Sequence, residues 1–365
     1  MPRDKIADLP LIWPTTLERP HRAKIAYLDL NHFINLAKCA HGHRAFQHYR
    51  ELLAAVLRAK EDGRATFPLS SVHYVEVANI EDLRRRRDVA EMMEAVTAFA
   101  SLLDRPTLAR LELREAIRER LRLDVSLDRY PLLGSGVLRA FGKQGGLKVW
   151  NEAGEDVTAS ARTKVGHEEF DRQMAKAELD LNRSVLSGVL APEHGELPPS
   201  VEQAASELKV GIRTRLQFET DFVEMLKKPE HGEFRKERLR DAVSAREMAH
   251  EWIDALLEEL HAVGASVQDV MGNEPQSARR FAEAMPSTRV AISMKTRYHR
   301  NPQRMWTMND VHDIDAASTA VAYCDAVFSD KHVWNALTIA RELEPMRTFL
   351  PRKPEQLAEW LELLP

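Results

Sequence analysis

The chain contains 365 residues, of which 44% are hydrophobic and 30% charged, with a net charge of −4. This composition excludes a disordered or fibrous chain, and no apolar run approaches the roughly 18 residues that a membrane span needs. Two cysteines, Cys39 and Cys324, are too few for a disulfide scaffold, and no secretory signal is visible. We therefore expect a cytoplasmic protein without a membrane partner, whose net charge gives no sign of nucleic-acid binding.

The first predicted elements alternate between strand and helix. Lys24–Leu30 is a short apolar run that predicts a buried strand ending near Asp29. Asn31 caps or opens the helix that follows, and Glu76 lies on a helix after the second predicted strand. The expected elements are helices at 31–40, 45–60, 72–80 and 82–103 and a second strand at 65–69.

The middle of the chain, residues 106–286, has a different pattern. Long segments rich in Arg and Glu carry apolar residues three and four apart, which predicts amphipathic helices. A possible strand at Leu147–Trp150 is the exception. We interpret this part as a mostly helical insert or second lobe. The expected helices cover 108–122, 168–190, 201–227 and 233–263.

Strand and helix alternate again after Pro286. Asp313–Tyr323 predicts a helix of small residues that Asp313 and Asp315 open, and Ala326–Ser329 predicts a strand that Asp330 follows directly. The alternation at both ends of the chain predicts an α/β fold, a parallel sheet with flanking helices that a large helical insert interrupts. The remaining expected elements are helices at 332–342 and 354–364 and a strand at 346–350.

Carboxylates mark the ends of several predicted elements. Asp29 and Asp330 each end an apolar strand, and Asp313 or Asp315 begins a helix. Parallel sheets place their sites at the carboxyl ends of the strands. A cluster of such carboxylates is not fully ionised without a cation, and Mg²⁺ or Mn²⁺ prefers these hard oxygen ligands. In phosphodiester cleavage one such ion activates water and a second stabilises the leaving oxygen.

Four short motifs carry a resemblance to a known family. They are Tyr27-Leu-Asp29-Leu-Asn31, Ser70-Ser-Val-His-Tyr-Val-Glu76, Asp313-Ile-Asp315 before a run of small residues, and Ser329-Asp330 at a strand end. In this order they resemble the PIN-domain nucleases, which are metal-dependent. The resemblance implies a PIN-like domain made of residues 1–105 and 287–365, with 106–286 as the helical insert.

The resemblance also implies the site. Asp29, Glu76, Asp313 and Asp330 would be catalytic and would bind Mg²⁺ or Mn²⁺. Asp315 competes with Asp313 for the third place, because residues at i and i+2 do not share a helix face. Asn31 and Ser329 occupy the small polar positions beside the acids, Ser329 where the family usually has Thr.

The implied reaction is hydrolysis of phosphodiester bonds, with RNA favoured over DNA. The resemblance further implies a toxin or phage-defence role and an inhibitory or regulatory protein partner. The stretch 279–304 is locally positive, and we expect Lys295, Arg297 and Arg300 to grip a phosphate backbone. A local field of this kind reconciles a nucleic-acid partner with a slightly acidic chain.

Other interpretations stay open. Asp29, Asp313 and Asp330 are each compatible with a simple helix cap, and Glu76 with a solvated helix position. The chain would then be a catalytically inactive PIN-like interaction protein that acts through its helical lobe. A phosphohydrolase of the haloacid dehalogenase type would need an acid two residues after Asp29, where this chain has Asn31.

Overall fold

The computed structural model describes residues 9–188, 199–231, 238–272 and 274–365. It is a mixed α/β protein, 66% helical, with a small parallel sheet. The chain divides into two compact units, which are described separately: unit 1 comprises 1–19, 105–131 and 198–352, and unit 2 comprises 20–104, 132–197 and 353–365. The fold class is therefore confirmed at the level of α/β, while the PIN-like arrangement and the predicted domain bounds stay predictions.

Unit 2 begins with the predicted strand and contains the four expected N-terminal helices. Lys24 and Ile25 of β2 pair in parallel with Ala65 and Thr66 of β3. The strands of unit 2 are β2 (Lys24–Leu28), β3 (Ala65–Thr66), β4 (Ala100–Leu102) and β6 (Leu133–Ser135). Its helices are α1 (Leu30–Ala40), η2 (Arg44–Tyr49), α2 (Arg50–Glu61), α3 (Ser71–Ala78), α4 (Leu83–Thr97), α6 (Gly136–Ala140), α7 (Thr158–Val165), α8 (His167–Ser187) and α18 (Pro354–Glu362).

The predicted helix 82–103 is wrong at its end. Helix α4 begins after the N-cap Asp82 and ends at Thr97, because Ala98 and Phe99 adopt left-handed backbone conformations with φ of 45° and 59°. The chain then forms strand β4, which pairs antiparallel with β6. Strand β3 is shorter than expected, and Pro68, which lacks an amide donor, follows it. The predicted strand at Leu147–Trp150 is reduced to a single bridge between Trp150 and Asp156.

Unit 1 is built mainly from helices. Its strands are β1 (Leu17–Glu18), β5 (Tyr130–Pro131), which pairs in parallel with β1, and β7 (Ala326–Phe328). Its helices are α5 (Arg105–Leu121), α9 (Pro199–Lys227), η3 (Pro229–His231), α11 (Leu239–Glu247), η4 (Met248–Trp252, a π-helical turn), α12 (Ile253–Ala262), α13 (Val267–Met271), α14 (Pro275–Ala284), α15 (Pro286–Arg300), α16 (Met308–Tyr323), α17 (Lys331–Thr338) and η5 (Arg341–Met346).

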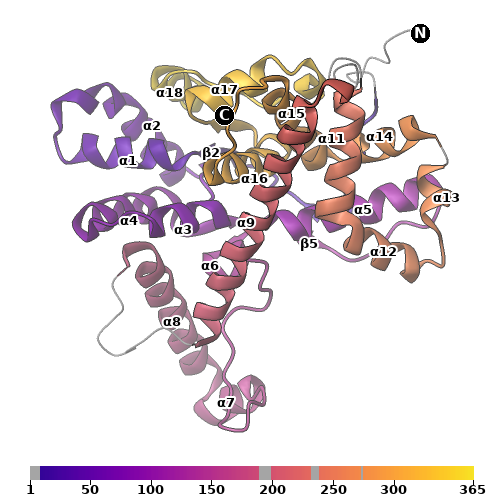
Figure 1. The fold of residues 1–365 in the computed structure, drawn as a ribbon. Helices are drawn as coiled ribbons and strands as arrows, with labels where there is room; N and C mark the ends of the chain where they lie inside the picture. Colours follow the sequence, from indigo (N-terminus) through magenta and orange to yellow (C-terminus); the bar gives the residue numbers. More distant parts are fainter. Residues whose placement is uncertain (1–8, 189–198, 232–237, 273) are drawn as a thin grey trace. The chain divides into compact units, whose positions relative to one another are not determined.

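An apolar core forms where helices α5, α11, α12, α14 and α15 of unit 1 meet (Figure 1). Leu113, Ile117, Leu256 and Ile292 are at most 2% exposed in this core. Burial of each such side chain contributes roughly 1.5–3 kcal/mol, which explains why the amphipathic segments fold as packed helices. Residues 189–190 and 233–237 of two expected helices lie outside the described residues.

The C-terminal elements differ from the prediction in two places. Helix α16 begins at Met308, with Thr307 and Asp310 forming a capping box, so Asp313 and Asp315 do not open it. The expected strand at 346–350 is reduced to a bridge between Phe349 and Ala326 of β7. Among the described residues we find no helix with the length and apolar character needed to cross a bilayer.

Candidate functional site

Asp29 follows the buried end of strand β2 in unit 2. The strand runs Lys24–Leu28, and its last four residues are buried. Asp29 is half-buried, has extended backbone (φ −64°, ψ 154°) and is the N-cap residue of α1. Asn31 is exposed, and its amide lies 3.5 Å from an Asp29 carboxylate oxygen. The strand-end position predicted for Asp29 is thus present in the structure.

Helix α3, which carries Glu76, is anchored to the same end of β2 by His73. The ring Nε2 of His73 donates to the carbonyl of Leu28 at 2.8 Å, and Nδ1 accepts from the Ser70 amide at 3.0 Å. Full burial lowers the pKa of His73 to about 4, so the ring is neutral and each nitrogen has a defined role. Since Leu28 precedes Asp29 and His73 lies one turn before Glu76, this hydrogen bond joins the two acidic segments of unit 2.

Asp313 and Asp330 belong to unit 1. Asp313 lies in the second turn of α16 and is half-buried. Asp330 follows β7 and is the N-cap of α17, where its carboxylate accepts from the Val333 amide at 2.7 Å. Ser329 is half-buried, and its hydroxyl lies 3.5 Å from the Asp330 carbonyl oxygen. After each of the strands β2 and β7, an Asp is therefore the N-cap of the next helix, directly after β2 and one residue further on after β7.

Tyr298 of α15 lies near both acids of unit 1. Its ring is 2% exposed and stacks on His332, two residues after Asp330, with ring centroids 5.2 Å apart. Burial raises the pKa of the Tyr298 hydroxyl, and the carboxylates of Asp313, Asp310 and Asp330 raise it further. Asp313 and Asp330 thus act electrostatically on one hydroxyl.

Asp315 faces two arginines. Its Oδ1 accepts from Arg105 Nη1 at 2.7 Å and from Arg215 Nη2 at 2.7 Å, and its Oδ2 accepts from Arg215 Nη1 at 2.6 Å. Burial alone would raise the pKa of Asp315, but the guanidinium groups of Arg215 and Arg105 hold it below the usual range. Both oxygens of Asp315 are therefore committed to ion pairs within unit 1.

These contacts belong to a larger group, which we call the buried ion cluster. The ammonium of Lys295 lies 2.9 Å from Glu219, 2.7 Å from Glu247 and 3.2 Å from Glu251. The three carboxylates raise the pKa of Lys295 despite its burial, and Lys295 in turn lowers the pKa of Glu219 to about 2. The cluster consists of Arg105, Arg215, Glu219, Glu247, Glu251, Lys295, His299 and Asp315.

The predicted basic stretch is mostly interior. Lys295 is 5% exposed, and its ion pairs make a structural role the simpler interpretation of this residue. Arg289 is fully buried, and its guanidinium donates to the carbonyls of Glu283 and Leu9. Arg297 is half-buried and Arg300 is exposed, so these two remain accessible for the predicted contact with a phosphate backbone.

Sequence reasoning missed the buried ion cluster, although a signal for it was present. In three segments of the sequence, two charged or titratable groups of the cluster lie four residues apart, a spacing that puts both on one face of a helix. These pairs are Arg215 with Glu219, Glu247 with Glu251, and Lys295 with His299. His73 was also missed, although its place at the third position after the N-cap Ser70 is the capping-box position.

The donor chemistry of the four predicted acids suits a hard divalent cation, since all of them offer carboxylate oxygens. Asp29 and Glu76 belong to unit 2, and Asp313 and Asp330 belong to unit 1. Within either unit, the residues that the structure describes contain no group of three or more His, Cys, Asp or Glu side chains placed to hold a metal ion. The metal assignment stays a prediction.

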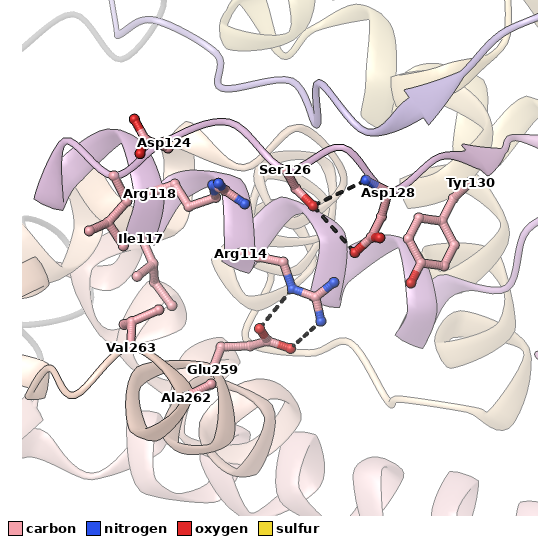
Figure 2. Close-up of a pocket in the computed structure, with 11 residues that line it drawn as sticks. Arg114, Ile117, Arg118, Asp124, Ser126, Asp128, Tyr130, Glu259, Ala262 and Val263 are labelled. Carbon is pink, nitrogen blue, oxygen red and sulfur yellow. Dashed lines mark hydrogen bonds and ion pairs between the residues drawn. The ribbon is translucent and has the colours of Figure 1, made fainter.

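A pocket of about 550 Å³ lies elsewhere in unit 1, between α5, the loop after it and α12 (Figure 2). Arg114 and Glu259 form a two-pronged ion pair on its wall, with both N–O distances 2.8 Å. Ser126 and Asp128 also line the pocket and are hydrogen-bonded to each other. None of the predicted site residues lines this pocket.

We compared the chain with models of protein families, with curated proteins and with solved structures. A match in any of these comparisons would have indicated a family for the chain without reference to the short motifs. None of the three finds a match, so the resemblance to PIN-domain nucleases stays a prediction from the short motifs.

Proposed function

We propose that the protein is a divalent-metal-dependent nuclease that hydrolyses phosphodiester bonds, with RNA as the preferred substrate. The observation that carries the proposal is that an Asp lies between each of the strands β2 and β7 and the following helix: Asp29 directly follows β2 and is the N-cap of α1, and Asp330 follows β7 after Ser329 and is the N-cap of α17. Parallel strands of α/β proteins present their functional groups at this end. The resemblance of the four motifs to PIN-domain nucleases points the same way.

Each unit contributes one pair of acids to the proposal. In unit 2, the hydrogen bond from His73 to Leu28 joins the segments of Asp29 and Glu76. In unit 1, Asp313 and Asp330 both act on the Tyr298 hydroxyl. Because Asp315 is engaged by Arg105 and Arg215, we assign the third acidic position to Asp313.

The four acids would hold Mg²⁺ or Mn²⁺, and a bound ion would stabilise the charge that develops on the phosphate during hydrolysis. The role of the carboxylates would be to hold the ion. Arg297 and Arg300 would supply a cationic surface for the backbone of the nucleic acid, since both side chains are at least partly exposed.

The test is cleavage of labelled RNA and DNA with Mg²⁺ or Mn²⁺ by wild type, Asp29→Asn and Asp330→Asn. We expect cleavage of RNA by wild type and a fall of about 100-fold or more in each variant, because even indirect partners of metal ligands cost 10–100-fold. Asp325→Asn is the matched control. Asp325 lies directly before β7, at the other end of the strand from Asp330, and is 3.8 Å from Arg19.

Activity of Asp325→Asn should stay near that of wild type. Absence of cleavage by wild type with either ion would overturn the proposal and would favour the interaction protein. Equal loss in Asp325→Asn and Asp330→Asn would show that the effect is on folding, and would remove the assignment of Asp330.

A further inference from the structure

The pocket between α5, the loop after it and α12 contains an arginine whose charge is not paired. Arg118 of α5 lines the pocket (Figure 2), and in the described part of the chain no carboxylate forms an ion pair with its guanidinium group. Its Nε is buried and has no hydrogen-bond partner among the described residues. The other described residues with buried polar atoms of this kind do not line the pocket. Arg118 therefore has both a charge and hydrogen-bond donors available to a ligand.

Arg114, one turn earlier on the same face of α5, is already neutralised. Its guanidinium group forms two hydrogen bonds of 2.8 Å to Glu259 of α12. The Glu259 carboxylate and the Tyr130 side chain both raise the pKa of Arg114, because they stabilise its charged form. The pair of Arg114 and Glu259 thus adds little net charge to the pocket, which leaves Arg118 as its cationic group.

Two aspartates on the loop after α5 supply the opposite charge. Asp124 and Asp128 line the pocket, and both are exposed. Asp128 accepts from the Ser126 hydroxyl at 3.3 Å, and neither aspartate forms an ion pair within the residues that the structure describes. A phosphate or another multiply charged anion would be repelled by the two carboxylates. A ligand that carries both a positive and a negative charge would find a partner for each.

Apolar side chains form the rest of the pocket wall. They are Ile117 of α5, Leu123 of the loop, and Ala262 and Val263 of α12. Leu123 is 41% and Val263 43% exposed, so a ligand that covers them would bury apolar surface. The volume, about 550 Å³, lies within the roughly 300–1,000 Å³ that is typical of small-molecule sites. The wall therefore suits a ligand with a small apolar body.

We propose that this pocket binds a small zwitterion with an apolar body, of which an apolar amino acid is the simplest example. The carboxylate of the ligand pairs with Arg118, whose planar guanidinium group matches the two oxygens of a carboxylate. The ammonium group of the ligand is attracted by Asp124 and Asp128, and its apolar body covers Leu123 and Val263. Because none of the four predicted acids lines the pocket, the inference is independent of the proposed nuclease function.

Calorimetric titration of the protein with phenylalanine and leucine tests the proposal, together with two analogues of phenylalanine that each lack one charge. N-acetylphenylalanine has no ammonium group, and phenethylamine has no carboxylate. We expect wild type to bind both amino acids. The Kd for each analogue should be about 10-fold higher or more, because a hydrogen bond between charged groups is lost. Phenyl phosphate should not compete with phenylalanine.

Arg118→Gln removes the cation of the pocket, and Arg120→Gln is the matched control. Arg120 lies two residues further along α5, is exposed and does not line the pocket. Arg118→Gln should raise the Kd for phenylalanine about 10-fold or more. It should leave the urea midpoint of unfolding unchanged, because the Arg118 guanidinium group has no partner among the described residues. Arg120→Gln should change neither quantity.

The double variant Asp124→Asn with Asp128→Asn tests the other end of the ligand. It should raise the Kd for phenylalanine and leave the Kd for N-acetylphenylalanine unchanged or lower, because only the first ligand has an ammonium group. This comparison of two ligands separates recognition from a change in folding, which would weaken the binding of both.

Each of three results would overturn the inference. Wild type that binds neither phenylalanine nor leucine would show that the pocket is not a site for such zwitterions. Equal affinity for phenylalanine and N-acetylphenylalanine would show that the aspartates do not recognise an ammonium group. Equal Kd values for Arg118→Gln and Arg120→Gln would show that Arg118 does not bind the carboxylate. None of these results depends on cleavage of RNA, so the proposed function is tested separately.

Discussion

Neutral hydrogen bonds hold the acidic segments of unit 2, whereas buried charges hold the segment of Asp315 in unit 1. His73, Ser70 and Tyr27 tie α3 to the end of β2, and His73 is neutral in the folded state. In unit 1, Lys295 and Asp315 lie in the buried ion cluster, which joins α5, α9, α11, α15 and α16. A buried charge that loses its partner costs more than a lost neutral hydrogen bond. The two units should therefore respond differently to comparable substitutions.

Lys295→Met is expected to have the largest effect. It leaves the carboxylates of Glu219, Glu247 and Glu251 without the ammonium between them. Removal of one partner from a buried ion pair lowers the free energy of unfolding by about 3–5 kcal/mol. Urea denaturation measures this change, and Lys295→Met combined with Glu219→Gln should recover part of it. A loss below about 1 kcal/mol would mean that the cluster is solvated and weak.

His73→Phe is expected to have the next largest effect, in unit 2. The variant leaves the Leu28 carbonyl and the Ser70 amide without the ring nitrogens that bind them, which costs about 1–3 kcal/mol at pH 7. Hydrogen exchange of the α3 amides localises the loss. His73→Gln should restore the bond to Ser70, because Gln also fits the capping-box position.

The pKa of His73 also predicts how the stability difference between wild type and His73→Phe changes with pH. The pKa of His73 is about 4 in the folded protein, below the value near 6.5 of an unfolded chain. The unfolded state then binds more protons between these values, so the contribution of His73 is complete above pH 6.5 and falls by about 3 kcal/mol as the pH falls to 4. The difference in stability between wild type and His73→Phe should narrow over this range. A constant difference would contradict the neutral, buried ring.

Local patterns in the sequence were sufficient for the elements that carry the candidate acids. The apolar run of β2 and the strand β7, each followed by an Asp, were predicted because burial and capping depend on neighbouring residues. Strand β4 was missed because Ala98 and Phe99 take left-handed conformations that no glycine announces. Short apolar runs likewise gave two strand predictions, 147–150 and 346–350, that are single bridges in the structure.

The contacts of the candidate site were harder to predict from the sequence, because the residues that form its ion pairs lie far apart along the chain. Arg105 and Asp315 are 210 positions apart, and Arg215 and Asp315 are 100 apart. The spacing of Asp313 and Asp315 did not show which of them takes the third acidic position. In the structure they differ, because Arg105 and Arg215 form ion pairs with Asp315. The basic stretch also looked like a surface, because net charge along a segment does not show that Arg289 and Lys295 point inward.

Tyr27→Phe is expected to have a smaller effect within the neutral network of unit 2. The Tyr27 hydroxyl lies 3.0 Å from Ser70 Oγ, which also lies 3.3 Å from His73 Nδ1. Since Ser70 keeps a second partner, the loss should be about 1 kcal/mol. A double-mutant cycle with Ser70→Ala measures the coupling. A coupling energy of zero would show that Tyr27 does not support the position of α3.

Arg183→Gln is expected to have the smallest effect on the free energy of unfolding. It tests whether the charge of an ion pair or its burial determines how much stability is lost when one partner is removed. Arg183 of α8 binds Glu94 of α4 in unit 2, with Nε 3.0 Å from both carboxylate oxygens, and its side chain is 52% exposed. The geometry is as favourable as that around Lys295, whose side chain is 6% exposed. Exposed pairs contribute only about 0.2–1 kcal/mol, because water solvates each partner when the other is lost.

The contribution of this pair should also disappear in about 1 M salt, where the screening length is near 3 Å. Urea denaturation of wild type and Arg183→Gln at low and high salt measures both effects, with Glu94→Gln as the reciprocal variant. A loss at high salt as large as that of Lys295→Met would mean that charge itself stabilises both units. A small, salt-sensitive loss would mean that exclusion of water, which leaves the carboxylates around Lys295 without an alternative partner, makes the buried ion cluster the more sensitive of the two networks.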